Sequence, residues 1–192
     1  MAYKINREVV ARSQYLQTLI KDVMDNSDSN DWDSAVTEWE ISDAEEDELL
    51  EESCICGKEH LRYLFTIENQ LNGNVLYPIG SSCIKKFERD DLKYEVDVKV
   101  QLFKLLHAVE DNEFLQLSSK FFSRKLLRYL FEVGAFKATK WNDFEPEKDY
   151  EFMIDMFNRH DRTEKQNKKA VAIILTSIKP FLQEELAHKV KK

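Results

Sequence analysis

The sequence predicts an α+β fold that is mostly helical, with one small β-hairpin module packed on or beside a helical bundle. Three observations lead to this prediction. Apolar residues recur at helical spacing through most of the chain, and they alternate with period two in only one short region. The chain has only 4 glycines and 3 prolines, too few for an all-β fold with many tight turns. We expect three parts: an N-terminal helix and acidic loop (1–35), the hairpin module (36–90) and a helical domain (91–192).

The N-terminal part begins with an apolar stripe at helical spacing, which predicts an amphipathic helix over residues 5–24. The polar stretch 25–33 has the composition of a loop. Trp39, Glu40 and Ile41 suit a short strand. Residues 43–52 suit a short acidic helix or a loop that leads into the cysteines.

The hairpin is predicted by alternation and by a turn. Leu61, Tyr63, Phe65 and Ile67 alternate with polar residues, as in a half-buried strand. Asn72-Gly73 is a strong turn signal because both residue types tolerate positive φ, and residues 75–79 then return as the second strand. Ser81 or Ser82 is expected to cap a short helix that contains Cys83.

The remaining helices are predicted mainly by their caps. Residues 92–110 carry apolar side chains at three-to-four spacing. Ser123 is expected to cap a helix that ends before Gly134, and Pro146 fits the first turn of the next helix. The sequence from Thr163 to Gln166 matches a capping box and opens a helix that reaches residue 178. Pro180 is expected to end or kink that helix, with residues 181–192 as its continuation.

Composition indicates a compact, intracellular protein. Hydrophobic residues make up 43% of the 192 residues, enough for a core. No apolar run approaches about 18 residues, so no membrane span is expected, and the N-terminus lacks a secretory signal. The cysteines number 3 and all lie within residues 54–83, which favours metal binding in a reducing compartment over disulfides. We expect a cytoplasmic location.

The charge is distributed unevenly. The net charge is −8, yet residues 22–57 hold 14 acidic residues and no Lys or Arg, so the rest of the chain is net positive. The acidic segment has three readings: a solvated surface that aids solubility, an imitation of nucleic-acid phosphate, or a docking face for a basic partner.

The cysteines are spaced as for a structural zinc site. Cys54, Cys56 and Gly57 form a tight turn that can present two thiolates to one ion, and the hairpin brings Cys83 back beside that turn. A helix start near Cys83 would stabilise its thiolate. His60 is the expected fourth ligand. The alternatives for that position are Glu59, His107, His160, His188 or a water, and a water would permit catalysis. The competing interpretation is three buried free thiols.

Residues 36–90 also resemble a known module. The features that carry the resemblance are Cys54-x-Cys56-Gly57-Lys58, the turn at Asn72-Gly73, and the run from Pro78 through Cys83 to Phe87. Together they look like a zinc-knuckle module of phage and mobile-element proteins, and two helical segments, 122–127 and 177–182, have a similar phage-protein character. A metal-stapled, acidic phage protein of this size is similar to some type II-A anti-CRISPR proteins. The resemblance implies an inhibitor of the Cas9 nuclease.

Other catalytic patterns are not met. The glycines are too scattered for a phosphate-binding loop, and no serine lies in a nucleophile elbow. His160-Asp161 has no second histidine-aspartate pair at a workable spacing. We therefore expect a binding protein rather than an enzyme.

The preferred functional hypothesis is a non-enzymatic zinc-binding interaction protein. Its partner-binding surface is expected to comprise Glu45, Glu46, Asp47 and Glu48 with Trp32 and Trp39. The partner is expected to be a protein with a basic surface, and Cas9 is the candidate that the resemblance supplies. The alternative is a zinc-ribbon-like nucleic-acid-binding protein, in which basic residues such as Lys85 and Lys86 contact phosphate. A zinc hydrolase is a third possibility.

Overall fold

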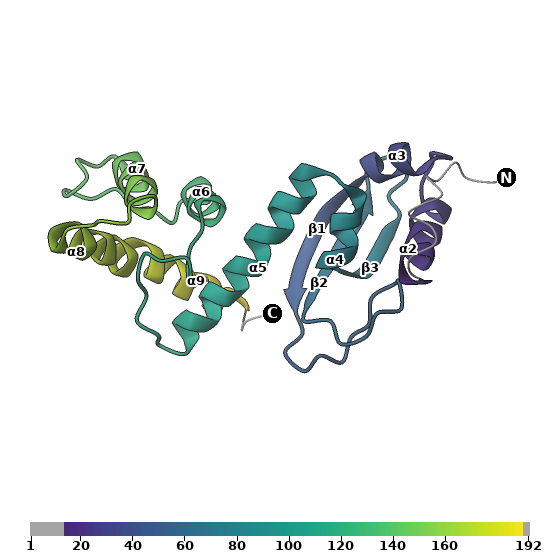
Figure 1. Ribbon diagram of the computed structural model, residues 1–192, viewed down its shortest axis with the longest axis horizontal. Helices are drawn as coiled ribbons and strands as arrows, with labels where there is room; N and C mark the ends of the chain where they lie inside the picture. Colours follow the sequence, from purple (N-terminus) through teal and green to yellow (C-terminus); the bar gives the residue numbers. More distant parts are fainter. Residues whose placement is uncertain (1–13, 190–192) are drawn as a thin grey trace. The chain divides into compact units, whose positions relative to one another are not determined.

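The computed structural model describes residues 14–189, and the chain forms two compact units that divide between Val96 and Asp97 (Figure 1). The α+β prediction, with helices in the majority, is confirmed. The part of the predicted first helix that precedes Gln14 lies outside the described residues. The predicted boundary between residues 35 and 36 falls inside the first unit, and helix α5 (Asp90–Glu110) runs through the division between the units.

The first unit contains a three-stranded antiparallel sheet in the order β1-β2-β3. Its elements are α2 (Gln14–Asp25), α3 (Trp32–Ala35), the 3-10 turn η1 (Val36–Glu38), β1 (Trp39–Glu46), β2 (Tyr63–Asn69), β3 (Val75–Gly80), α4 (Ser81–Ile84) and the 3-10 turn η2 (Lys85–Phe87). The predicted hairpin is β2 and β3, which lie side by side in Figure 1. One side of the unit is packed by Ile20, Met24 and Ala35, against which Leu16 and Trp32 lie.

Strand β1 is longer than the sequence predicted. The expectation of a helix or loop from residue 43 is wrong for residues 43–46, which pair with β2 as far as Glu46 opposite Tyr63. A bulge lies between Ile41 and Asp43. The acidic composition of residues 43–46 does not suggest a strand, and the strand that they pair with, β2, begins only after a long loop. Pairing at that distance leaves no local signal in the sequence.

A buried carboxylate joins the tip of the hairpin to the loop after α2. Glu38 is only 4% exposed, and its carboxylate accepts hydrogen bonds from the backbone N–H groups of Asp28 (2.9 Å) and Ser29 (2.8 Å) and from Nδ2 of Asn69 (2.6 Å). Burial by itself would raise the pKa of Glu38, but these hydrogen bonds outweigh it and the pKa is lowered. Trp39 is anchored to the same loop through its Nε1, which donates to Ser27 Oγ at 2.9 Å.

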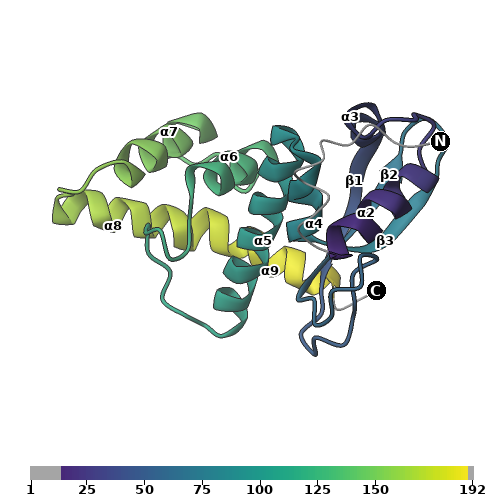
Figure 2. The ribbon, with the colours of Figure 1, turned by 45° about the vertical axis from the view of Figure 1, so that its right-hand side comes forward.

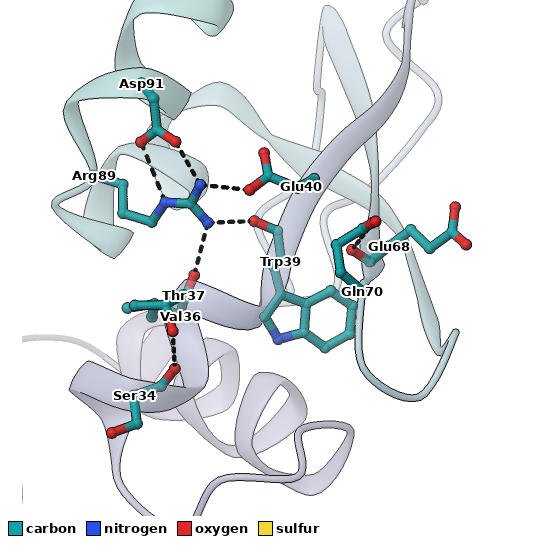
Figure 3. A network of polar contacts seen from close by, with 9 residues as sticks. All are labelled: Ser34, Val36, Thr37, Trp39, Glu40, Glu68, Gln70, Arg89 and Asp91. Carbon is teal, nitrogen blue, oxygen red and sulfur yellow. Dashed lines mark hydrogen bonds and ion pairs between the residues drawn. The ribbon is translucent and has the colours of Figure 1, made fainter.

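Arg89 ties the start of β1 to the start of α5 (Figure 3). Its Nη1 donates to the carbonyls of Trp39 (2.5 Å) and Val36 (3.2 Å), its Nη2 pairs with Glu40 at 2.6 Å, and its Nε and Nη2 both contact the carboxylate of Asp91. Only 17% of the Arg89 side chain is exposed. A planar guanidinium fork can serve all of these acceptors at once, which an ammonium group cannot do.

The second unit is helical. Its elements are the rest of α5, α6 (Arg124–Glu132), α7 (Pro146–Phe157), α8 (Glu164–Ile173), the π-helical segment η3 (Ile174–Ile178) and α9 (Lys179–Lys189). The caps and helix starts predicted for this unit are confirmed. Ser123 accepts from the backbone N–H of Leu126, Pro146 lies in the first turn of α7, and Thr163 with Gln166 forms a complete capping box. Gly134 adopts positive φ just after α6.

The helix continues through Pro180 instead of ending there, as Figure 2 shows for α8 and α9. Proline has no N–H to offer the carbonyl of Thr176, so regular α-helical bonding is interrupted at this point. The π-helical segment immediately precedes the proline, and such segments absorb a local break in the bonding pattern. Among the described residues, no helix is both long and apolar enough to cross a membrane.

Candidate metal centre

The loop between β1 and β2 is organised by one carboxylate. Asp47 accepts four backbone N–H groups: Oδ1 binds those of Leu49 (3.0 Å) and Leu50 (3.1 Å), and Oδ2 binds those of Glu51 (2.7 Å) and Glu52 (2.9 Å). These hydrogen bonds, foremost that from Glu52, lower the pKa of Asp47. Charge-assisted bonds of this kind are about twice as strong as neutral ones. The loop that leads to the cysteines is therefore folded around Asp47.

The first two cysteines lie on a tight turn. The N–H of Gly57 donates to the carbonyl of Cys54 at 2.7 Å, and the N–H of Cys54 donates to the carbonyl of Lys58 at 2.8 Å. Gly57 has φ of +91°, a conformation that residues with a side chain rarely adopt. The turn is joined to β3 because the N–H of Ile55 donates to the carbonyl of Pro78 at 2.9 Å.

Cys83 lies in the short helix α4, which directly follows β3. The serine cap expected for this helix is not formed, because the N-cap residue is Gly80 and no side chain caps the helix. The N–H of Gly80 instead donates to Sγ of Cys54 at 3.3 Å. A backbone donor thus points at one of the three sulfur atoms, as commonly seen at thiolate sites.

The predicted meeting of the three cysteines is confirmed. Sγ of Cys83 lies 3.6 Å from Sγ of Cys54 and 3.4 Å from Sγ of Cys56, and all three sulfur atoms lie within 4.8 Å of one another. A disulfide requires a sulfur–sulfur distance of about 2.0 Å, so these are free thiols. Two thiolates bound to one zinc at about 2.3 Å in a tetrahedron lie about 3.8 Å apart. The cluster could therefore hold a metal ion.

The three cysteine thiols differ in pKa. Cys54 accepts a hydrogen bond from Cys83 and others from backbone N–H groups, and its pKa is lowered to about 5. The same hydrogen bond with Cys54 is the main cause that raises the pKa of Cys83, while burial raises that of Cys56. Grouped sulfur atoms compete for a single negative charge. A divalent cation among them would remove that competition and favour all three thiolates.

His60 is not brought into the cluster. Its Nδ1 lies 3.0 Å from the carbonyl oxygen of Leu50, and the ring lines a cavity of about 130 Å³ together with Cys54 and Cys83. The backbone of His60 has φ of +59°. Within residues 14–187, whose side chains are described, Glu59 does not join the three sulfur atoms either, and His107 and His160 belong to the second unit. The side chain of His188 lies outside that range.

The expected partner-binding residues differ in their exposure to solvent. The prediction for Trp39 is wrong, since this side chain is 0% exposed and cannot contact a partner. Trp32 is half-buried, with its ring edge-to-face on Phe87 at 5.5 Å. Glu46 pairs with Arg62 at 2.7 Å and has a side chain only 7% exposed. Asp47 is occupied by its backbone contacts, and only Glu45 and Glu48 are exposed.

Two structural contributors were missed from the sequence. Asp47 was grouped with its acidic neighbours, although its carboxylate folds the loop. Gly80 lies between the predicted strand 75–79 and the predicted short helix and was given no role of its own, although its N–H contacts a sulfur atom. A single Asp at the start of a loop is only a weak signal that its carboxylate will bind the backbone N–H groups that follow it. No sequence signal marks the role of Gly80.

No protein-family model matches the chain, and comparison with curated proteins and with solved structures gives no match to either.

Proposed function

We propose that this protein is a non-enzymatic binding protein whose recognition loop is held by one structural zinc ion. The observation that carries the proposal is that three sulfur atoms converge, although Cys83 follows Cys54 by 29 residues and Cys56 by 27 residues in the sequence. Such a cluster of cysteines matches the ligand chemistry of structural zinc, which prefers thiolate and imidazole donors.

His60 is the proposed fourth ligand. A carbonyl oxygen only accepts hydrogen bonds, so the contact with Leu50 makes Nδ1 the donor and leaves Nε2 as the unprotonated nitrogen of a neutral ring. Zinc-bound histidines usually donate their other ring N–H to a carbonyl or carboxylate in this way. The ring already lines the cavity that Cys54 and Cys83 share. The exposed His60 side chain would have to move toward the three sulfur atoms to complete the set, because it does not lie among them in this structure.

The zinc would stabilise the loop over residues 47–61. Apart from the buried Cys54, Cys56 and Leu61, most of this loop is exposed, and it carries the acidic side chains Glu48, Glu51 and Glu52 close in sequence to Glu45 of β1. Rigid display lowers the entropy cost of binding, and the charge favours a partner with a basic surface. Cas9, whose inhibition the resemblance to anti-CRISPR proteins implies, is one such candidate partner, because its nucleic-acid channels are lined with positive charge.

The test is a pair of charge-reversal variants in a binding assay. Glu45→Lys with Glu48→Lys should weaken binding to a basic partner and reduce its salt dependence. Glu184→Lys with Glu185→Lys changes the net charge equally at exposed sites of the second unit and should leave binding unchanged. Purified Cas9 with its guide RNA is the first partner to test, by DNA cleavage and by co-sedimentation. Unchanged cleavage and absence of binding would remove Cas9 from the proposal.

A nucleic-acid-binding module is the second candidate function. Lys58, Lys85 and Lys86 are exposed and lie close in sequence to the metal-binding cysteines. Binding of duplex or single-stranded oligonucleotides that is lost when Lys58 and Lys86 are changed to Glu would favour this candidate. Binding unaffected by those changes would count against it.

A further inference from the structure

The second unit presents two large aromatic side chains to solvent on one loop. Trp141 is 81% exposed and Phe144 is 71% exposed, both within the loop 137–145, which is the second part of the connection between α6 and α7. Isolated exposed apolar residues are normal in proteins, but two large rings at the tip of one loop are not. Their exposure needs an explanation in terms of what they bind.

This loop is rigid, because a buried amide holds it from inside. Asn142 is 3% exposed; its Nδ2 donates to the carbonyl of Lys137 (2.9 Å) and to Oδ2 of Asp149 (2.8 Å), and its Oδ1 accepts from the N–H of Thr139 (2.8 Å). The carbonyl of Thr139 accepts from the N–H of Phe144 at 2.8 Å. The rings are therefore held outward by a folded loop and are not exposed through disorder.

The loop also holds strained backbone. Asp143 and Phe144 have φ of +55° and +62°, and a bulky residue rarely adopts this left-handed conformation. The Asn142 contacts keep this conformation in place. Strain that is maintained at an exposed site, where it presents a ring to solvent, is typical of a binding function.

The charges differ between the two rings, and positive charge lies on the Trp141 side of the loop. Beside Phe144, Lys148 of α7 pairs with both Asp143 (2.8 Å) and Glu145 (3.1 Å), which leaves one net negative charge among the three. Lys140 is exposed with its Nζ 4.8 Å from the centroid of the Trp141 ring. Lys137 is exposed as well, and within the described residues it has no carboxylate partner. Glu147, at the start of α7, is a further acid, and like Glu145 it follows Phe144 in the chain, on the side away from these two lysines in sequence.

The surroundings of the rings distinguish a nucleic acid from a protein partner. The centre of a protein–protein interface is depleted in Lys, Asp and Glu, whereas Trp141 and Phe144 are flanked by these residue types. Aromatic rings next to unpaired lysines are the arrangement that binds single-stranded nucleic acid, with bases stacked on the rings and phosphates on the cations. A duplex would hide the faces of its bases from these rings.

We propose that the loop 137–145 is a binding site for single-stranded nucleic acid, in which Trp141 and Phe144 stack on bases while Lys137 and Lys140 contact phosphates. The site lies entirely in the second unit and does not depend on the metal centre or on the function proposed for it. DNA and RNA share this chemistry, so the test includes both.

Tryptophan fluorescence provides a direct readout. The chain has 3 tryptophans; Trp39 is buried and Trp32 is packed on Phe87, so quenching by a stacked base should arise from Trp141. The full-length protein is titrated with oligo(dT), oligo(U) and a duplex of equal length. We expect quenching by one or both single strands and much weaker quenching by the duplex. Trp32→Phe should retain the quenching and Trp141→Phe should lose it.

Binding is measured separately by the anisotropy of a labelled oligonucleotide. Trp141→Ala should weaken it about tenfold or more, and Trp141→Phe should restore most of the affinity because a ring is retained. Changing Lys137 and Lys140 to Ala should reduce the slope of log affinity against log salt by about 1.4. Because Trp141 is exposed, these variants should fold, and their thermal unfolding is checked first.

Three results would overturn the proposal. The first is no binding of either oligonucleotide at low salt. The second is equal binding by wild type and Trp141→Ala, or equal quenching by polyglutamate, which would reduce the effect to charge alone. The third is Trp141-dependent self-association in sedimentation without oligonucleotide binding, which would make the loop a protein-docking site.

Discussion

The backbone N–H of Gly80 donates to Sγ of Cys54 at 3.3 Å, although 26 residues separate the two. This contact joins the end of β3 to the cysteine turn, and the packing around Gly80 leaves little room for a larger residue. A Cβ atom at position 80 would lie 3.1 Å from Cδ2 of Leu61, which is itself buried. The last residue of β3 is therefore fitted to the candidate metal centre by a polar contact and by tight packing.

Gly80→Ala should lower the free energy of unfolding by about 1 kcal/mol, since Leu61 must move to accept the added methyl group. The same shift moves the backbone donor away from Cys54, so metal affinity should fall too. Urea unfolding and competition with a chelator measure the two effects. Ser82→Ala, at an exposed neighbouring position, is the control and should change neither. Wild-type metal affinity in the Gly80→Ala variant would show that this contact does not support the site.

Asp47→Asn should loosen the loop between β1 and β2. The amide offers one acceptor in place of two carboxylate oxygens, so the N–H groups of residues 49–52 lose about half of their partners. Amide hydrogen exchange at these four positions should accelerate, and metal affinity should drop. Glu48→Gln removes an equal charge from an exposed neighbour and should leave both quantities near the wild-type values. Equal exchange rates in the two variants would contradict the capping role.

Glu38→Gln should cost about 2 kcal/mol of stability near neutral pH, because the amide NH₂ is placed against backbone N–H donors and the charge-assisted bonds are lost. The pKa of Glu38 is lowered from its ordinary 4.5, so its contribution is fully present above that pH. The contribution disappears as the pH falls through the lowered pKa. The difference in free energy of unfolding between wild type and variant should therefore decrease toward zero in acid.

The pH series is compared with Glu51→Gln, an exposed carboxylate whose removal should produce no such closing gap. A gap for Glu38→Gln that stays constant from neutral pH into strong acid would mean that the carboxylate is not the ionised acceptor described above.

Arg89→Lys should destabilise the first unit even though the charge is kept. A lysine cannot reach the carbonyls of Val36 and Trp39 and the carboxylates of Glu40 and Asp91 together (Figure 3). We expect a loss of about 2 kcal/mol in urea unfolding, from hydrogen bonds to a charged group. Arg128→Lys, whose exposed i,i+4 pair with Glu132 has the same residue types, should cost about 0.5 kcal/mol or less. Equal losses in the two variants would show that the Arg89 fork has no special role.

The parts of the structure that were predicted correctly depend on local chemistry. The caps at Ser123 and Thr163 satisfy N–H groups within the next turn, so a few adjacent residues contain the whole signal. The same is true of the hairpin turn at Asn72-Gly73. The convergence of the cysteines was also predictable, because a hairpin necessarily returns Cys83 to the level of the residues that precede it.

The parts that were not predicted depend on distant partners. The extension of β1 to Glu46 needs β2, and the burial of Trp39 needs the loop after α2 as well as the sheet. The roles of Asp47 and Glu46 differ from those of Glu45 and Glu48 although the four residues are adjacent and alike in charge. The path of the backbone alone determines which of these carboxylates contacts the protein and which faces solvent.

Metal analysis of the purified protein, followed by cobalt substitution, tests the proposed zinc site. We expect one zinc per chain, and cobalt spectra with the intense sulfur-to-metal charge transfer and the visible bands of a tetrahedral site with three sulfur ligands and one nitrogen. Cys83→Ser should abolish tight binding, and His60→Ala should weaken it at least about tenfold and shift the visible bands. Purified protein that takes up no zinc, or that binds it equally well without Cys83, would contradict the account.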